Sequence, residues 1–128
     1  MEFSMDQARK VVESGIDQAT DLLRDKQKMQ GLLGQATETL KGLPGDMIKD
    51  APLMVAMIRD YVTGAYKNVS VKVVASMVAA LVYLLKGKDI IPDSIPIVGR
   101  LDDIAVIAFA IKFCEKELNE YDAWKKAQ

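Results

Sequence analysis

The chain has 128 residues, half of them hydrophobic and 6% aromatic, and its 17 basic and 18 acidic residues nearly cancel. This length is typical of one domain with a sizeable core, and the balanced charge without a basic stripe argues against a nucleic-acid partner. Histidine is absent and Cys114 is the single cysteine, which excludes histidine-based nucleophiles, imidazole zinc sites and an internal disulfide. We find no catalytic constellation, and with no signal-peptide pattern at the N-terminus we expect a cytoplasmic protein.

Residues 4–23 predict an amphipathic helix. Ser4 and Gln7 have the spacing of a capping box, and apolar residues then recur at helical intervals. The charges between them have mixed signs, so packing against a core is favoured over attachment to a membrane surface. The next stretch, residues 31–46, holds four glycines and Pro44 around a short helical segment at 35–41. It predicts a flexible joint, so that residues 1–45 form an N-terminal helix and joint.

Two further helices are expected after this joint, one that begins near residue 50 and one at residues 71–86. Asp50 can cap a helix that has Pro52 in its first turn, and Ser70 can cap the following helix, residues 71–86. That helix has only a narrow polar stripe, so it lies either at the centre of a bundle or in lipid. Its apolar run from Val73 to Leu85 reaches ~20 Å as a helix, against ~30 Å for a hydrocarbon core. A central buried helix is favoured over a re-entrant or interfacial hairpin.

The last predicted helix extends from Asp102 to Trp124. Its apolar residues alternate at intervals of three and four, which indicates a packing seam that includes Cys114 and Tyr121. Cys114 is expected there as a small buried side chain. The predicted fold is therefore an all-α, single-domain bundle of four or five helices. Its centre is an antiparallel hairpin within residues 50–124, around which the other helices pack.

The connection inside this hairpin, "LLKGKDIIPDSIPIVGRLDD", contains four aspartates. Its prolines prevent one continuous helix, and its isoleucines can pack beneath the turn. The four carboxylates are explained as turn and helix caps. The alternative is a divalent-cation site of oxygen ligands, although an EF-hand is excluded because Arg100 stands where a glutamate is required. The candidate ligands are Asp89, Asp93, Asp102 and Asp103.

These residues resemble the YkvA-like family, a bacterial domain of unknown function. The resemblance covers roughly residues 59–116, with Gly87 standing where the family usually has a proline. It implies a helical hairpin in small proteins often described as membrane-associated, and it provides no catalytic residues. Besides the four aspartates, the motif positions are Tyr83, Leu84, Ile91, Pro92, Ile95, Pro96 and Gly99.

Three functions stay open at this point. The leading one is a non-catalytic interaction or scaffold module without a cofactor, which binds a protein partner or itself and includes binding inhibitors and immunity-type proteins. The second is a peripheral membrane protein whose apolar hairpin enters one leaflet. The third is an enzyme or sensor that binds a divalent cation through the loop aspartates.

Overall fold

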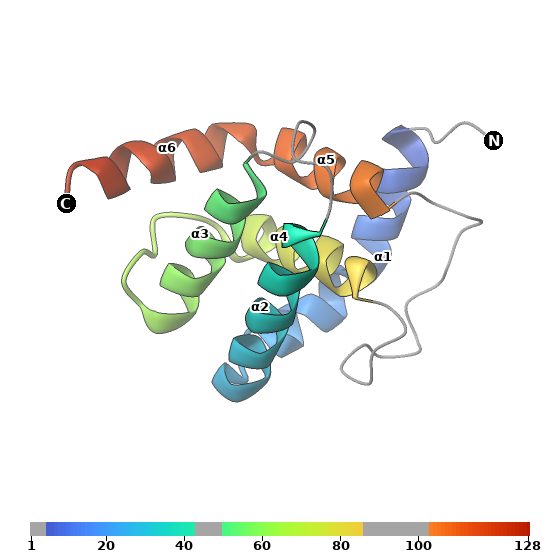
Figure 1. Cartoon of the computed structure of the whole chain (residues 1–128), viewed down its shortest axis with the longest axis horizontal. Helices are drawn as coiled ribbons and strands as arrows, with labels where there is room; N and C mark the ends of the chain where they lie inside the picture. Colours follow the sequence, from blue (N-terminus) through green and yellow to red (C-terminus); the bar gives the residue numbers. More distant parts are fainter. Residues whose placement is uncertain (1–4, 43–49, 86–102) are drawn as a thin grey trace.

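The computed structural model describes residues 5–42, 50–85 and 103–128 (Figure 1). These ranges contain six α-helices and no strand, which confirms the predicted all-α, single-domain bundle. The helices are α1 (Met5–Leu22), α2 (Lys26–Lys41), α3 (Ala51–Thr63), α4 (Val71–Leu84), α5 (Asp103–Phe113) and α6 (Glu115–Lys126).

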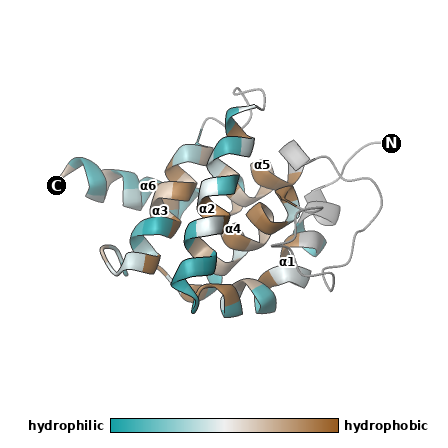
Figure 2. Cartoon of the chain, turned by 60° about the horizontal axis from the view of Figure 1, so that its bottom comes forward, coloured by the Kyte–Doolittle hydropathy of each residue, from teal (hydrophilic) through white to brown (hydrophobic). Residues whose placement is uncertain are grey.

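Helix α4 is the centre of the bundle, as its sequence predicts. Every residue from Val74 to Leu84 is buried, because α1, α2, α3 and α5 all pack against this helix. Figure 2 shows the hydrophobic α4 and α5 in the interior, with hydrophilic faces of α2, α3 and α6 turned outward. Of the expected polar stripe, Lys72 is exposed, whereas Ser76 is buried and its hydroxyl donates to the carbonyl oxygen of Lys72 at 2.8 Å. Burial of a side-chain hydroxyl is tolerated where it finds such an acceptor.

Helix α2 differs from the expected short helix beside a flexible joint. It begins at Lys26 and continues through Gly31 and Gly34 to Lys41. Glycine inside a helix costs about 1 kcal/mol relative to alanine, but here one face of the helix is buried, and apolar burial offsets that cost. Asp25 caps the start of the helix, since its carboxylate accepts a hydrogen bond from the Lys28 amide at 3.1 Å. The buried face consists of Met29, Leu32, Leu33, Ala36 and Leu40.

The predicted caps of α3 and α4 have different outcomes. Ser70 caps α4 as expected, because its hydroxyl accepts a hydrogen bond from the Val73 amide at 3.2 Å. Asp50 occupies the N-cap position of α3 but makes no side-chain capping bond, and Pro52 lies in the first turn. Helix α3 ends at Gly64, whose φ of 89° is favourable only for glycine.

The predicted final helix is divided into α5 and α6 at Cys114. The division is slight, because the Cys114 amide still bonds the Ala110 carbonyl at 3.0 Å and the Leu118 amide bonds the Cys114 carbonyl at 2.8 Å. The Cys114 thiol is buried and donates to the carbonyl oxygen of Val73 at 3.9 Å. This contact places the end of α5 beside the start of α4, so the two helices are antiparallel, as predicted.

Candidate functional site

Most of the motif in the α4–α5 connection lies outside the described residues. This applies to Asp89, Asp93 and Asp102, and to the apolar positions Ile91, Pro92, Ile95, Pro96 and Gly99. Asp103 is the first residue of α5, but its side chain is not described. Tyr83 is buried in α4. Within the described ranges no three metal-ligating side chains come together, so the cation site remains a prediction.

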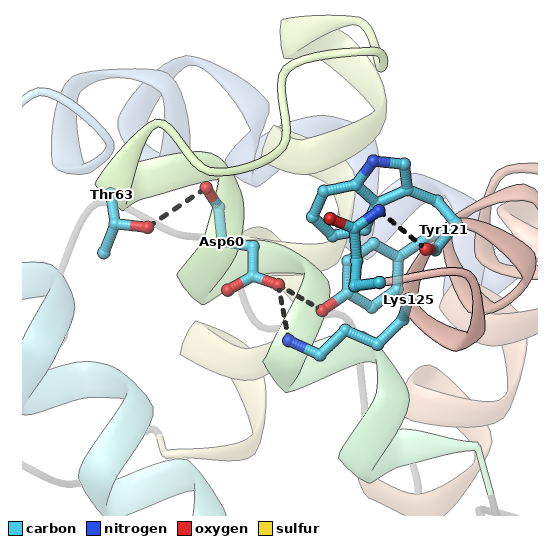
Figure 3. Close-up of polar contacts among 6 residues, drawn as sticks. Asp60, Thr63, Tyr121 and Lys125 are labelled. Carbon is cyan, nitrogen blue, oxygen red and sulfur yellow. Dashed lines mark hydrogen bonds and ion pairs between the residues drawn. The ribbon is translucent and has the colours of Figure 1, made fainter.

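The structure reveals a polar contact between α3 and α6 that the sequence did not predict. Tyr121 Oη donates a hydrogen bond to Asp60 Oδ2 at 2.5 Å, and Lys125 Nζ lies 3.2 Å from the same oxygen (Figure 3). The side chain of Asp60 is 16% exposed to solvent, and that of Lys125 is 55% exposed. We call Asp60, Tyr121 and Lys125 the α3–α6 clamp. Tyr121 and Lys125 are one helical turn apart, which presents both donors to one carboxylate.

Aromatic side chains surround the clamp. The ring of Tyr66 packs edge-on against Tyr121 with centroids 5.0 Å apart, and it lies 4.9 Å from the ring of Trp124. Burial raises the pKa of Tyr66, with a smaller contribution from the negative charge of Glu120. Burial also raises the pKa of Tyr121, and the hydrogen bond to Asp60 and its charge add to this effect, against a weaker opposing effect of Arg59. Tyr121 is therefore a protonated donor at neutral pH.

Cys114 is equally unsuited to chemistry. Burial, and secondarily the charge of Glu117, raises the pKa of its thiol to about 12. The thiolate is the reactive form of cysteine, so this side chain is a packed structural residue, as the sequence predicted. The contacts of the clamp join α3 to α6, and the cysteine packs between α5 and α4.

Exposed apolar side chains occur at the end of the α4–α5 pair where the Cys114 thiol meets the Val73 carbonyl. The large apolar side chains classed as exposed among the described residues are Val71, at 45%, and Phe113, at 53%. The Phe113 ring stacks on that of Phe109 with centroids 5.6 Å apart. We call Val71, Phe109 and Phe113 the α4–α5 corner. Charged side chains flank it in sequence and are exposed; they are Lys72, Lys112, Glu115 and Lys116.

Helix length bears on how the chain meets a membrane. Among residues 5–42, 50–85 and 103–128, no helix combines the length and the apolar character needed to cross a bilayer. Helix α4, with 14 residues, would reach only ~20 Å.

Comparisons with known proteins point to the same segment of the chain. Residues 73–109 match the model of a family described as "Protein of unknown function (DUF1232)". The protein described as "Uncharacterized membrane protein YkvA" of Bacillus subtilis (strain 168) is 38% identical over 69 residues, which are 54% of this chain and 65% of that relative. The chain thus covers less than two thirds of the length of this relative, and no solved structure matches it. The two matches confirm the resemblance seen in the sequence: the segment that contains α4 and most of α5 is YkvA-like.

Proposed function

We propose that this protein is a non-catalytic helical module that attaches peripherally to a membrane surface through the α4–α5 corner. The observation that carries the proposal is the exposure of Phe113 and Val71 at the same end of the central helix pair. Apolar side chains exposed near one another mark contact surfaces when they form a continuous patch, and these two lie at one end of the same helix pair. The name of the Bacillus subtilis relative, a membrane protein, supports lipid as the contact.

The enclosure of α4 favours attachment at the surface over a re-entrant hairpin. Other helices cover this helix from Val74 to Leu84, so its insertion into lipid would first require them to separate. That separation would expose much of the core to water. The corner needs no such rearrangement, because Phe113 and Val71 already face solvent.

The protonation states of the buried groups support a non-catalytic role. Cys114 and Tyr121 have raised pKa values and keep their protons at neutral pH. A general base or nucleophile needs a pKa tuned toward the working pH. In this structure the pKa values of Cys114 and Tyr121 are raised, away from neutral pH.

The expected attachment is weak and reversible. Covering the exposed parts of Phe113 and Val71 in the bilayer interface contributes about 2 kcal/mol. Lys72, Lys112 and Lys116 each add about 1 kcal/mol at most beside anionic lipid, and the neighbouring Glu115 offsets part of that. Apolar contact therefore contributes at least as much as charge, and binding should decline only moderately with salt.

Flotation with vesicles tests the proposal. The protein should float with phosphatidylcholine vesicles containing phosphatidylglycerol, and less with phosphatidylcholine alone. Phe113→Ser should weaken partitioning about five- to tenfold, the equivalent of losing roughly 1–1.4 kcal/mol. Ala123→Ser, a change at an exposed position of α6, is the control and should leave flotation unchanged.

Two results would contradict the proposal. One is wild-type protein that remains in the aqueous fraction with both vesicle compositions. The other is flotation that Phe113→Ser does not reduce. If light scattering instead detects a dimer that Phe113→Ser converts to a monomer, the corner binds a second copy of the chain.

A further inference from the structure

A groove between α2 and α3 lies apart from the surface assigned to the membrane. Its volume is about 470 Å³, which is within the range of small-molecule sites. The apolar part of its lining consists of Leu33 and Gly34 from α2 and Val62 from α3. Leu33 is only 3% exposed, so it forms a fixed floor.

The rim of the groove is cationic. Lys26 from α2 and Arg59 from α3 line it together with the neutral residues Gln30 and Thr63, and no carboxylate is part of the lining. Both cations are exposed. Two positive charges contributed by two helices therefore face one opening, in a chain whose formal net charge is −1.

The acid beside each of these cations in the sequence is engaged elsewhere. The carboxylate of Asp25 accepts the Lys28 amide at 3.1 Å as the cap of α2. The carboxylate of Asp60 is held by Tyr121 and Lys125 in the α3–α6 clamp. In the described part of the chain neither Lys26 nor Arg59 makes an ion pair, so both charges are available to a ligand.

A neighbouring hollow shows that the two ends of the groove differ in charge. It shares Gln30 and Gly34 with the groove and is also lined by Glu38, whose carboxylate lies 3.6 Å from Lys41 Nζ. The negative charge is thus on the far side of Gly34 from Lys26. An anionic head should lie between Lys26 and Arg59, with its apolar tail over Leu33 and Gly34.

From this arrangement we infer that the α2–α3 groove binds a small organic anion with an apolar chain, of the medium-chain monocarboxylate class. The carboxylate takes charge-assisted hydrogen bonds from Lys26 and Arg59, and the chain covers the floor. This binding site is independent of the attachment proposed for the α4–α5 corner.

NMR titration of the full chain, labelled with ¹⁵N, tests the inference with defined probes. Octanoate should shift the amide signals of Gln30, Gly34, Val62 and Thr63 in a saturable manner. Butyrate should bind more weakly than octanoate, because each buried methylene contributes. Octylamine, of the same length but opposite charge, and inorganic phosphate, without a chain, should shift these signals little.

Variants separate the groove from the rest of the molecule. Lys26→Gln and Arg59→Gln should each weaken octanoate binding about two- to fivefold, as expected for exposed charges. Lys28→Gln, a matched change in the same helical turn but outside the lining, should have no effect. Gly34→Leu should abolish binding, and since a Cβ at Gly34 meets no atom within 4 Å, the variant should still fold.

Three outcomes would overturn the inference. The first is the absence of saturable shifts with octanoate in wild-type protein. The second is equal binding of octylamine or phosphate, which would remove the role of the cations or of the apolar floor. The third is folded Gly34→Leu protein, judged by its spectrum, that binds octanoate like the wild type.

Discussion

Tyr121→Phe removes the short hydrogen bond of the α3–α6 clamp and leaves the ring in place. A hydrogen bond to a charged group contributes about 1.5–3 kcal/mol, and Asp60, with 16% of its side chain exposed, has limited access to water as a replacement. We expect Tyr121→Phe to lower the free energy of unfolding by about 1.5–3 kcal/mol, toward the lower end because Lys125 remains 3.2 Å from the carboxylate. For a chain of 128 residues this is a loss of about 5–10 °C in Tm.

The pH dependence distinguishes the hydrogen bond from simple packing. The pKa of Tyr121 is raised in the folded protein above the ordinary value for tyrosine of about 10, so the folded state holds the phenolic proton more tightly than the unfolded state. The stabilisation from this group is complete below pH ~10 and is lost as the pH rises toward the folded pKa. Wild-type protein should therefore lose stability above pH ~10 faster than Tyr121→Phe, and the difference between them should narrow.

Urea unfolding at pH 7 and across pH 9–11, followed by far-UV circular dichroism, measures both effects. Tyr61→Phe is the matched control, because this half-buried tyrosine on α3 makes no hydroxyl hydrogen bond among the described residues. It should change stability by less than about 0.5 kcal/mol. Equal stability of Tyr121→Phe and wild type at pH 7, or parallel pH profiles, would refute the clamp.

Other expected effects concern single caps, thiols and glycines. Ser70→Ala should cost about 1 kcal/mol in urea unfolding, since it removes the cap on the Val73 amide; an unchanged midpoint would contradict this. Cys114 should not react with a thiol reagent at pH 8 until denaturant is added, because its pKa is about 12; rapid reaction of the folded protein would refute its burial. Gly34→Ala should raise stability by about 0.5–1 kcal/mol, since its new Cβ meets no atom within 4 Å; a loss of stability would show a constraint at this position.

The hydrophobic pattern predicted the centre of the fold because it reflects burial directly. A run from Val73 to Leu85 that is too short for a bilayer and apolar on nearly every side has few options outside a bundle. The same reasoning failed for α2. Gly31 and Gly34 lower helix propensity locally, but propensity is a weak prior that tertiary burial overrides, and the buried face of α2 extends over about three turns, from Met29 to Leu40.

The clamp could not be predicted for a different reason. Asp60 and Tyr121 are 61 positions apart, and no local pattern indicates which acid on α3 meets which donor on α6. The seam identified Tyr121 as a packing residue, which it is, without revealing the role of its hydroxyl. The loop aspartates Asp89, Asp93 and Asp102 lie outside the described residues, and their assignment as caps or cation ligands stays a prediction.

The enclosure of α4 has a consequence during synthesis on the ribosome. The helices that cover α4 lie both before and after it in the sequence. Helices α1, α2 and α3 are synthesised before α4, whereas α5 is synthesised after it. Until α5 packs against it, one side of this apolar helix stays exposed to water or to a chaperone, and such nascent surfaces are prone to aggregate.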